Sequence, residues 1–503
     1  MLFRNTLAQS ISRLSGYAFS IILAPIMLAQ LGLATFGVWA VTGAIAAYAG
    51  LLDFGISRSL SRFVALYETR GDRAAMRQCV GLGLIAVTAV SIASAIAAAL
   101  AAPVFVDLLG ELSVAEMRAV LLCSVAIFAL HAYRAVVISM PIGIREMVPP
   151  SVAGLIGNVL NFAFSVGALI LSTELVHYAI ANVVADSLGL VVTLISLRYM
   201  SQPFGVAMPS RALTREVLGF SVKSQVNWIA DLVNLQTDKV IIALLIDVRA
   251  AGAYEIAARV VAGVKSLGLL ALSAMIPTAT AHIAKHGRAV IADFYRRYTR
   301  QTVAIAFPIF VVTSISATYL LVAWLGEMPP DASEILVVLA MANFVNLMTG
   351  VAMTVSMGEG NAGIVAANST LSAAMNVVLT VALAPIFGLW GVLFGTFIAI
   401  SASSVIFIWR FHRRYGVPAR HFFEAVGPAA GLALGLAVPF VLWLVGFGEQ
   451  PGSRADAALP LLAFGTLYTV PYWVAASRLE LLPVRLRLPF VGRRPAPAGT
   501  LGR

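Results

Sequence analysis

The chain has 503 residues, of which 60% are hydrophobic and only 11% are charged. A soluble globular protein carries about 25% charged residues, so this composition excludes an ordinary soluble domain. The apolar residues come in blocks of about 20 or more, the length at which a helix crosses a hydrocarbon core of ~30 Å. The sequence therefore predicts an all-α integral membrane protein.

Fourteen apolar stretches are long enough to be membrane spans. The first runs on past Leu31, further than a cleavable signal peptide, so we expect it to be kept as a span. An even number of spans places both termini on the same side of the membrane. The predicted spans are residues 8–31, 35–55, 79–103, 118–140, 150–172, 176–197, 219–246, 252–280, 301–325, 335–357, 362–386, 390–410, 425–447 and 458–477.

The basic residues indicate on which side the termini lie. If the termini are cytoplasmic, the cytoplasmic segments hold 26 of the 34 lysines and arginines, whereas the opposite face holds three, Arg118, Arg249 and Arg454. This is the positive-inside pattern of membrane proteins. It predicts cytoplasmic termini and accounts for the net charge of +11 without any nucleic acid partner.

The composition also divides the chain into parts. A segment with Pro203, Gly205 and Pro209 follows the sixth span and marks the main internal boundary. The tail is rich in arginine, proline and glycine, and we expect it to be disordered. The predicted parts are an N-lobe (residues 1–200, spans 1–6), a C-lobe (201–412, spans 7–12), two further spans (413–478) and a basic cytoplasmic tail (479–503).

A short internal repeat relates the two lobes. The sequence LGLATFGVWAV, between spans one and two, is similar to IDVRAAGAYEIA, between spans seven and eight, which aligns Gly37 with Gly252 and Trp39 with Tyr254. Repeats in the same orientation imply a pseudo-two-fold axis along the membrane normal, with the site between the halves. The repeat predicts two six-helix lobes around a central cavity, followed by two C-terminal helices.

One face of span seven is polar. Polar side chains that face lipid are costly, so this stripe must face a partner helix or a watery cavity. Span one carries a similar stripe that includes Arg13 and Ser20. The span-seven residues recur at spacings of 4, 4, 3 and 4, which places them on one side of a helix: Lys223, Asn227, Asp231, Asn234 and Asp238.

Charged residues in or near the spans are candidates for function. Glu255 and Arg259 are four residues apart, so an ion pair along one helix is open to them. The sequence has no catalytic motif, and its histidines and two cysteines lack metal-ligand spacing, so we expect no enzyme activity, cofactor or metal. Five residues of the set are acidic and five are basic: Arg13, Asp53, Arg134, Asp186, Asp231, Asp238, Lys239, Glu255, Arg259 and Lys265.

The first two spans resemble those of bacterial lipid-linked oligosaccharide flippases of the O-antigen and exopolysaccharide exporter type. The likeness lies in Phe36-Gly37-Val38-Trp39 and in Leu52-Asp53-Phe54-Gly55, and it continues from Asp238-Lys239 to Arg259. These flippases belong to the multidrug/oligosaccharidyl-lipid/polysaccharide exporter superfamily. The resemblance covers about the first 410 residues.

The resemblance implies a transporter of the bacterial inner membrane. Its substrate would be a polyprenyl-diphosphate-linked saccharide, flipped by alternating access for lipopolysaccharide or exopolysaccharide biosynthesis. Its partners would include membrane lipid and a polysaccharide polymerase or other export components. Basic residues would hold the diphosphate. The substrate-binding candidates are Arg13, Arg134, Arg259, Lys265, Asn227 and Asn234, and the ion-coupling candidates are Asp231, Asp238 and Glu255.

Two other functions stay open at this point. A cation-coupled multidrug antiporter of the same superfamily would need acidic groups in its cavity, and Asp231, Asp238 and Glu255 could supply them. A polymerase or ligase of lipid-linked sugars would need a sizeable extracytoplasmic loop, but no predicted outside loop exceeds about 15 residues. The basic residues in spans one, four and eight favour the flippase.

Overall fold

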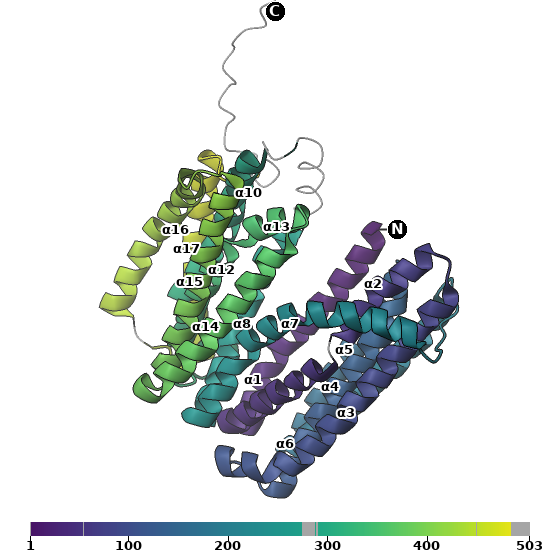
Figure 1. Cartoon of the computed structure of the whole chain (residues 1–503). Helices are drawn as coiled ribbons and strands as arrows, with labels where there is room; N and C mark the ends of the chain where they lie inside the picture. The colour runs from purple at the N-terminus through teal and green to yellow at the C-terminus, as the bar shows by residue number, and fades with distance from the viewer. Residues whose placement is uncertain (1, 54, 274–286, 288–289, 449, 484–503) are drawn as a thin grey trace, which may run out of the picture. The chain divides into compact units, whose positions relative to one another are not determined.

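The computed structural model describes residues 2–53, 55–273, 287, 290–448 and 450–483. Every regular element in these ranges is a helix (Figure 1). By its internal contacts the chain forms two compact units. The first comprises Met1–Arg259 and Ser369–Thr396, and the second comprises Val260–Asn368 and Phe397–Arg503.

The first unit holds the helices of the N-terminal half. They are α1 (Leu2–Ala49), α2 (Ile56–Thr69), α3 (Arg73–Leu109), α4 (Val114–Gly143), α5 (Val148–Leu171), α6 (Leu175–Ser196), α7 (Arg211–Leu245) and the first part of α8 (Val248–Ser273). Parts of α14 (Ala362–Phe387) and α15 (Leu389–Tyr415) complete this unit. Helix α3 packs along α4, and α5 packs along α6 (Figure 1).

The first two predicted spans meet at a break inside α1. Gly32 has φ 77° and ψ 165°, a non-helical conformation that glycine adopts without the penalty of a Cβ. This residue lies between the predicted ends at 31 and 35. The sequence therefore predicts correctly where the first membrane crossing ends and the second begins.

The two glycines that the internal repeat aligns lie against each other. A Cβ added at Gly37 would collide with the backbone oxygen of Val248, and it would lie 3.2 Å from the nitrogen of Gly252. A Cβ added at Gly252 would lie 2.7 Å from the backbone oxygen of Leu33. Leu33 and Val248 each precede their glycine by four residues, so the contact is reciprocal. This close approach of α1 and α8 supports the repeat and explains why both positions are glycine.

The segment after the second span was expected to be a cytoplasmic loop, but it forms the amphipathic helix α2. The carboxylate of Asp53 accepts hydrogen bonds from the backbone N–H groups of Gly55 (2.7 Å) and Ser57 (3.3 Å), which stabilises the start of α2. At the other end, Tyr67 donates a hydrogen bond to Glu216 of α7 at 2.8 Å. Burial and this carboxylate raise the pKa of Tyr67 to about 12, so the hydroxyl stays a donor.

The second unit holds the remaining helices. They are the end of α8, α10 (Ile291–Ile315), α11 (Ala317–Leu325), α12 (Ala332–Leu347), α13 (Gly350–Gly358), parts of α14 and α15, α16 (Arg420–Phe447) and α17 (Arg454–Arg478). Helices α10 and α11 are bent by 74° at Ser316, within the predicted span 301–325. Because α8, α14 and α15 each run from one unit into the other, the lobe boundaries at residues 200 and 412 stay predictions.

The C-terminal helix α17 is tied to α10 at a proline. Pro308 has no N–H, so the carbonyl of Ala304, one turn earlier in α10, lacks its helical hydrogen-bond donor. The hydroxyl of Tyr472 on α17 donates to that carbonyl at 2.9 Å. Buried backbone groups in a membrane need such partners, so α17 contributes directly to the stability of the second unit.

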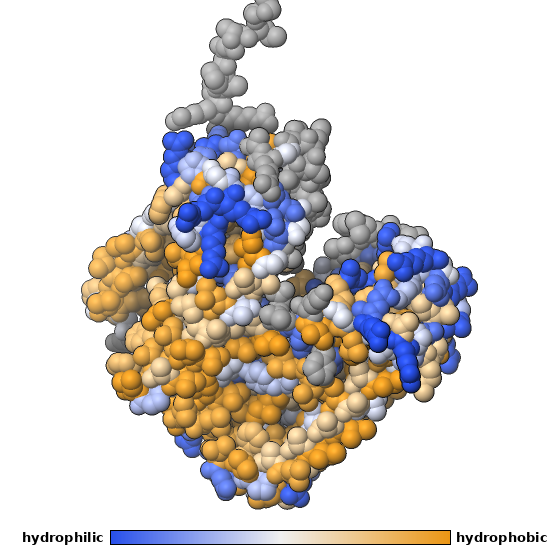
Figure 2. Space-filling view, viewed as in Figure 1, coloured by the Kyte–Doolittle hydropathy of each residue, from blue (hydrophilic) through white to orange (hydrophobic). Residues whose placement is uncertain are grey.

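The lengths and apolar surfaces of the helices show an integral membrane protein. Among the described residues, ten helices are long and apolar enough to span a membrane, or 11 if α10 and α11 form one span. In Figure 2, hydrophobic side chains cover the sides of the helices and hydrophilic ones gather near helix ends. Every predicted span falls on helices: the first two share α1, span 301–325 covers α10 and α11, and span 335–357 covers α12 and α13. Residues 274–280 of the eighth span lie outside the described residues. The chain is thus an all-α integral membrane protein.

Candidate functional site

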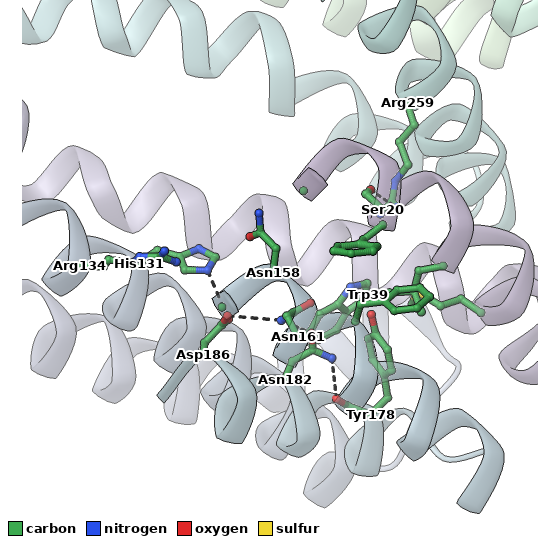
Figure 3. A pocket seen from close by; sticks show the side chains of 16 residues that line it. Ser20, Trp39, His131, Arg134, Asn158, Asn161, Tyr178, Asn182, Asp186 and Arg259 are labelled. Carbon is green, nitrogen blue, oxygen red and sulfur yellow. Dashed lines mark hydrogen bonds and ion pairs between the residues drawn. The ribbon is translucent and has the colours of Figure 1, made fainter. Parts of the chain in front are cut away.

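A pocket of about 250 Å³ lies among the helices of the first unit. Its walls come from α1, α4, α5 and α6, and α8 contributes one residue (Figure 3). The lining residues are Gly16, Phe19, Ser20, Leu23, Met27, Trp39, His131, Arg134, Gly157, Asn158, Asn161, Phe162, Tyr178, Asn182, Asp186 and Arg259.

Two of the predicted substrate-binding arginines line this pocket, Arg134 on α4 and Arg259 on α8, and they lie at its opposite ends (Figure 3). The side chain of Arg134 packs on α5, where glycines make room for it. A Cβ at Gly154 would lie 3.0 Å from its Nη2, and a Cβ at Gly157 would lie 3.4 Å from its Nη1. The absence of side chains at these glycines of α5 therefore leaves room for the guanidinium.

The guanidinium of Arg259 is held on three sides. Its Nε donates a hydrogen bond to Oε1 of Glu255 at 2.9 Å, which confirms the ion pair that the four-residue spacing suggested. Its Nη1 lies 3.4 Å from the hydroxyl of Ser20, and its carbon lies 5.2 Å from the centre of the Phe36 ring. The Nε is thus engaged along α8, while Nη1 is turned towards α1 and the pocket.

An acid–amide network lies on α4, α5 and α6. The carboxylate of Asp186 is 3.3 Å from Nε2 of His131 and accepts a hydrogen bond from Asn161 at 3.3 Å. Asn161 also donates to Asn182 at 3.0 Å, and Asn182 donates to the backbone oxygen of Tyr178 at 2.9 Å (Figure 3). No sequence spacing could pair His131 with Asp186, because the residues lie on different helices.

Aromatic rings form the remaining wall. Trp39 and Tyr178 meet edge to face with ring centres 5.2 Å apart, and Phe19 stacks on Phe162 at 4.8 Å. Apolar walls with a few convergent polar groups are typical of small-molecule sites. Two arginines against one aspartate give the pocket a formal charge of +1 when its histidine is neutral.

A second polar cluster is buried between α7, α8, α14 and α15. Oδ2 of Asp238 accepts hydrogen bonds from Tyr254 (2.7 Å) and Thr396 (2.9 Å), and Asn376 donates to Thr396 at 3.1 Å. Asp238 is only 1% exposed and Asn376 is fully buried. Among the described residues, Oδ1 of Asp238 and Oδ1 of Asn376 have no hydrogen-bond partner. Buried oxygens of this kind normally have one. The Asn376 amide lies beside the Asp238 carboxylate, so the two residues form one buried polar cluster.

Next to this cluster, Lys239 forms an ion pair with Glu255. The distance from Nζ to Oε2 is 2.5 Å. Asp238 and Glu255 therefore both lie between helices, and neither lines the pocket. This explains how ten intramembrane charges that sum to zero leave a pocket with a positive charge.

The other candidate residues lie elsewhere. Arg13 is exposed on α1, outside the pocket lining but on the helix face of Ser20, seven residues on. Asn234 accepts a hydrogen bond from Ser372 at 3.5 Å, and Asp231 is exposed on α7. Lys265, in the second unit, donates to Asn343 (3.0 Å) and Asn346 (3.1 Å). The side chain of Asn227 lies outside the described residues.

No group of three or more His, Cys, Asp or Glu residues could hold a metal ion in the part of the chain that the structure describes. Cys79 and Cys123 are free thiols, and Cys79 is buried, as expected for residues of the helix packing. The polar groups of the site thus offer ionic and hydrogen-bonding contacts to a ligand.

The fold is similar to that of two solved membrane proteins. A structure of the "Lipid II flippase MurJ" in an inward closed conformation matches 93% of this chain and 99% of its own, with a TM-score of 0.67 and 12% identity. An inward-facing "multidrug resistance MATE family transporter of the MOP superfamily" matches 81% of this chain and 98% of its own, with a TM-score of 0.64 and 16% identity. No curated protein sequence matches the chain.

The sequence identifies the family within this fold. The family model described as "Polysaccharide biosynthesis protein" matches residues 2–283, more than half of the chain. The chain therefore belongs to the polysaccharide biosynthesis protein family. The two structural neighbours are titled a lipid flippase and a multidrug transporter.

Proposed function

We propose that the chain is a flippase for a polyprenyl-diphosphate-linked oligosaccharide. It would move this lipid from the cytoplasmic to the outer leaflet of the bacterial inner membrane by alternating access, for lipopolysaccharide or exopolysaccharide biosynthesis. The observation that carries the proposal is the positively charged pocket among membrane helices, in a chain of the polysaccharide biosynthesis family. A polysaccharide polymerase would take up the product, and both termini would be cytoplasmic.

In this proposal Arg134 and Arg259 bind the anionic part of the substrate. The planar guanidinium of arginine fits phosphate oxygens with two parallel hydrogen bonds. The asparagines and aromatic rings between them suit a sugar, because they offer hydrogen bonds and apolar faces. Arg13, Lys265, Asn227 and Asn234 stay candidates for contacts in other steps of transport.

We propose Asp238 as the site of the coupling cation. Its unpartnered Oδ1 and that of Asn376 are buried together with the hydroxyl of Thr396. Oxygen ligands of this kind suit a hard cation such as Na⁺. Glu255 already serves two cationic side chains and is less suited to bind an ion, and Asp231 stays a candidate on the exposed side of α7.

The decisive experiment is translocation by the purified protein in liposomes. Liposomes that hold a defined polyprenyl-diphosphate-linked sugar on one leaflet are probed with a membrane-impermeant reagent that oxidises sugars. We expect the protein to expose the sugar on the other leaflet, faster with a Na⁺ gradient, and protein-free liposomes not to. Equal rates with and without protein would refute the flippase.

The alternative is a cation-coupled multidrug antiporter. Asp186 favours it, because this partly buried carboxylate lines the pocket and could bind a cationic drug. The two arginines that line the same pocket oppose it. Extrusion of a cationic dye, driven by an ion gradient in a susceptible strain, would favour the antiporter over the flippase.

A further inference from the structure

Three charged side chains form a continuous chain in the first unit. Nζ of Lys239 lies 2.5 Å from Oε2 of Glu255, and Oε1 of the same carboxylate accepts a hydrogen bond from Nε of Arg259 at 2.9 Å. The side chains of Lys239, Glu255 and Arg259 are 9%, 14% and 22% exposed. One carboxylate thus serves two cations, on α7 and α8, with little access to water.

One end of this chain adjoins the candidate cation site. Lys239 follows Asp238 in α7, and Glu255 follows Tyr254 in α8. Two contacts therefore join the same turns of the two helices, Tyr254 to Asp238 at 2.7 Å and Lys239 to Glu255 at 2.5 Å. A change of charge at Asp238 acts on Lys239 with little screening, because both groups are buried.

The other end reaches the pocket. Nε of Arg259 donates to Glu255, whereas its Nη groups face the pocket, where Nη1 lies 3.4 Å from Ser20. The stronger the ion pair between Glu255 and Arg259, the more weakly the guanidinium attracts an anion in the pocket. The strength of that ion pair depends in turn on how strongly Glu255 interacts with Lys239.

We propose that Glu255 is a positioning residue that couples anion binding in the pocket to cation binding at Asp238. A cation at Asp238 neutralises that carboxylate. Lys239 then interacts electrostatically with Glu255 alone, and the ion pair between Glu255 and Arg259 becomes weaker. When the cation leaves, Asp238 attracts Lys239, and Glu255 pairs more strongly with Arg259. The cation therefore strengthens anion binding, and the coupling is positive.

This inference rests on the proposed function, which supplies both the anion pocket and the cation site. It differs from a purely structural role for the ion pairs. Side chains that only hold α7 against α8 would leave the two binding events independent. Coupling through Glu255 instead requires reciprocity, so that the anion strengthens cation binding by the same factor as the cation strengthens anion binding.

The test measures binding of farnesyl diphosphate and of Na⁺ to the full chain in lipid nanodiscs by calorimetry. An organic cation replaces Na⁺ at constant ionic strength. In the wild type we expect Na⁺ to tighten farnesyl diphosphate binding by roughly 5-fold or more, the lower end of common allosteric couplings, and farnesyl diphosphate to tighten Na⁺ binding equally.

Two variants break the chain, and only the second keeps the net charge of the trio. Lys239→Met leaves a neutral Glu255–Arg259 pair, and the double variant Lys239→Met/Glu255→Gln leaves the same net charge as the wild-type trio. We expect both variants to bind farnesyl diphosphate without Na⁺. Na⁺ should tighten this binding by less than about 2-fold, below the range of common allosteric couplings. Glu424→Gln, which removes an exposed carboxylate 3.7 Å from Arg296, is the control that keeps the enhancement.

The outcomes separate the two proposals. If the wild type does not bind farnesyl diphosphate at all, the proposed function fails. If it binds both ligands independently, only the coupling is refuted. If the variants keep the full enhancement by Na⁺, the coupling does not pass through Glu255 and the inference is wrong.

Discussion

Arg259 is the residue whose removal should affect the proposed function most. Replacing it by alanine takes a guanidinium out of the pocket, while Glu255 keeps its ion pair with Lys239 at 2.5 Å. The remaining pair is neutral, so we expect Arg259→Ala to fold. Its effect can then be read as a loss of binding.

The magnitude follows from the donors that Arg259 has available. Its Nε is engaged by Glu255, and the bond of Nη1 to Ser20 is long at 3.4 Å. Its Nη groups can therefore donate two charge-assisted hydrogen bonds to phosphate oxygens, each worth about 1.5–3 kcal/mol. At the lower end their loss sums to about 3 kcal/mol, which is roughly a 100-fold weaker affinity.

The assay is farnesyl diphosphate binding by calorimetry, together with flipping of a lipid-linked sugar in liposomes. Arg259→Lys keeps the charge but lacks the planar fork, so we expect it to bind more weakly than the wild type and more tightly than Arg259→Ala. Arg118→Ala, at an exposed position at the start of α4, is the control and should bind as the wild type does. Wild-type affinity in Arg259→Ala would refute the role of this residue in the pocket.

Three further predictions address the fold and the second site. Gly37→Ala forces a Cβ onto a backbone oxygen and should lower the stability by about 1–3 kcal/mol, which a lower thermal midpoint would show. The control Gly43→Ala, whose Cβ would meet no neighbouring atom within 4 Å, should leave the thermal midpoint unchanged. Tyr472→Phe leaves the carbonyl that Pro308 exposes without a donor and should cost about 1–2 kcal/mol, whereas the 78% exposed Tyr199→Phe should have little effect. Asp238→Asn should abolish the stimulation of flipping by Na⁺, and stimulation that persists in this variant would exclude Asp238 as the cation site.

The membrane spans could be predicted from the sequence because they depend on local composition. Blocks of apolar residues predict the membrane helices, and Gly32 lies where the first two spans separate. Helix α2 was missed, although its signal was present. Its buried residues recur at helical spacing: Ile56, Leu60, Phe63, Val64 and Tyr67. Because arginines lie among them, we interpreted the segment as a cytoplasmic loop.

Side-chain partners were predictable only within one helix. The Glu255–Arg259 pair followed from a spacing of four residues, and the structure confirms it. The Lys239–Glu255 pair joins two helices, and the contact between His131 and Asp186 joins α4 to α6. Which face of a helix meets which neighbour depends on the packing of the whole unit, and a single sequence does not carry that information.

The two polar stripes that the sequence predicts, on α1 and α7, lie in different surroundings. The polar face of α1 lines the pocket with Gly16 and Ser20, whereas α7 turns Asp238 into the packed interior against α8 and α15. The contact of Gly37 with Gly252 holds α1 and α8 close together, and the side chain of Arg259 on α8 lies 3.4 Å from Ser20 on α1. The coupling that we propose needs an anion site and a cation site that stay apart and still influence each other. The ion pairs from Arg259 through Glu255 to Lys239, next to Asp238, meet both conditions.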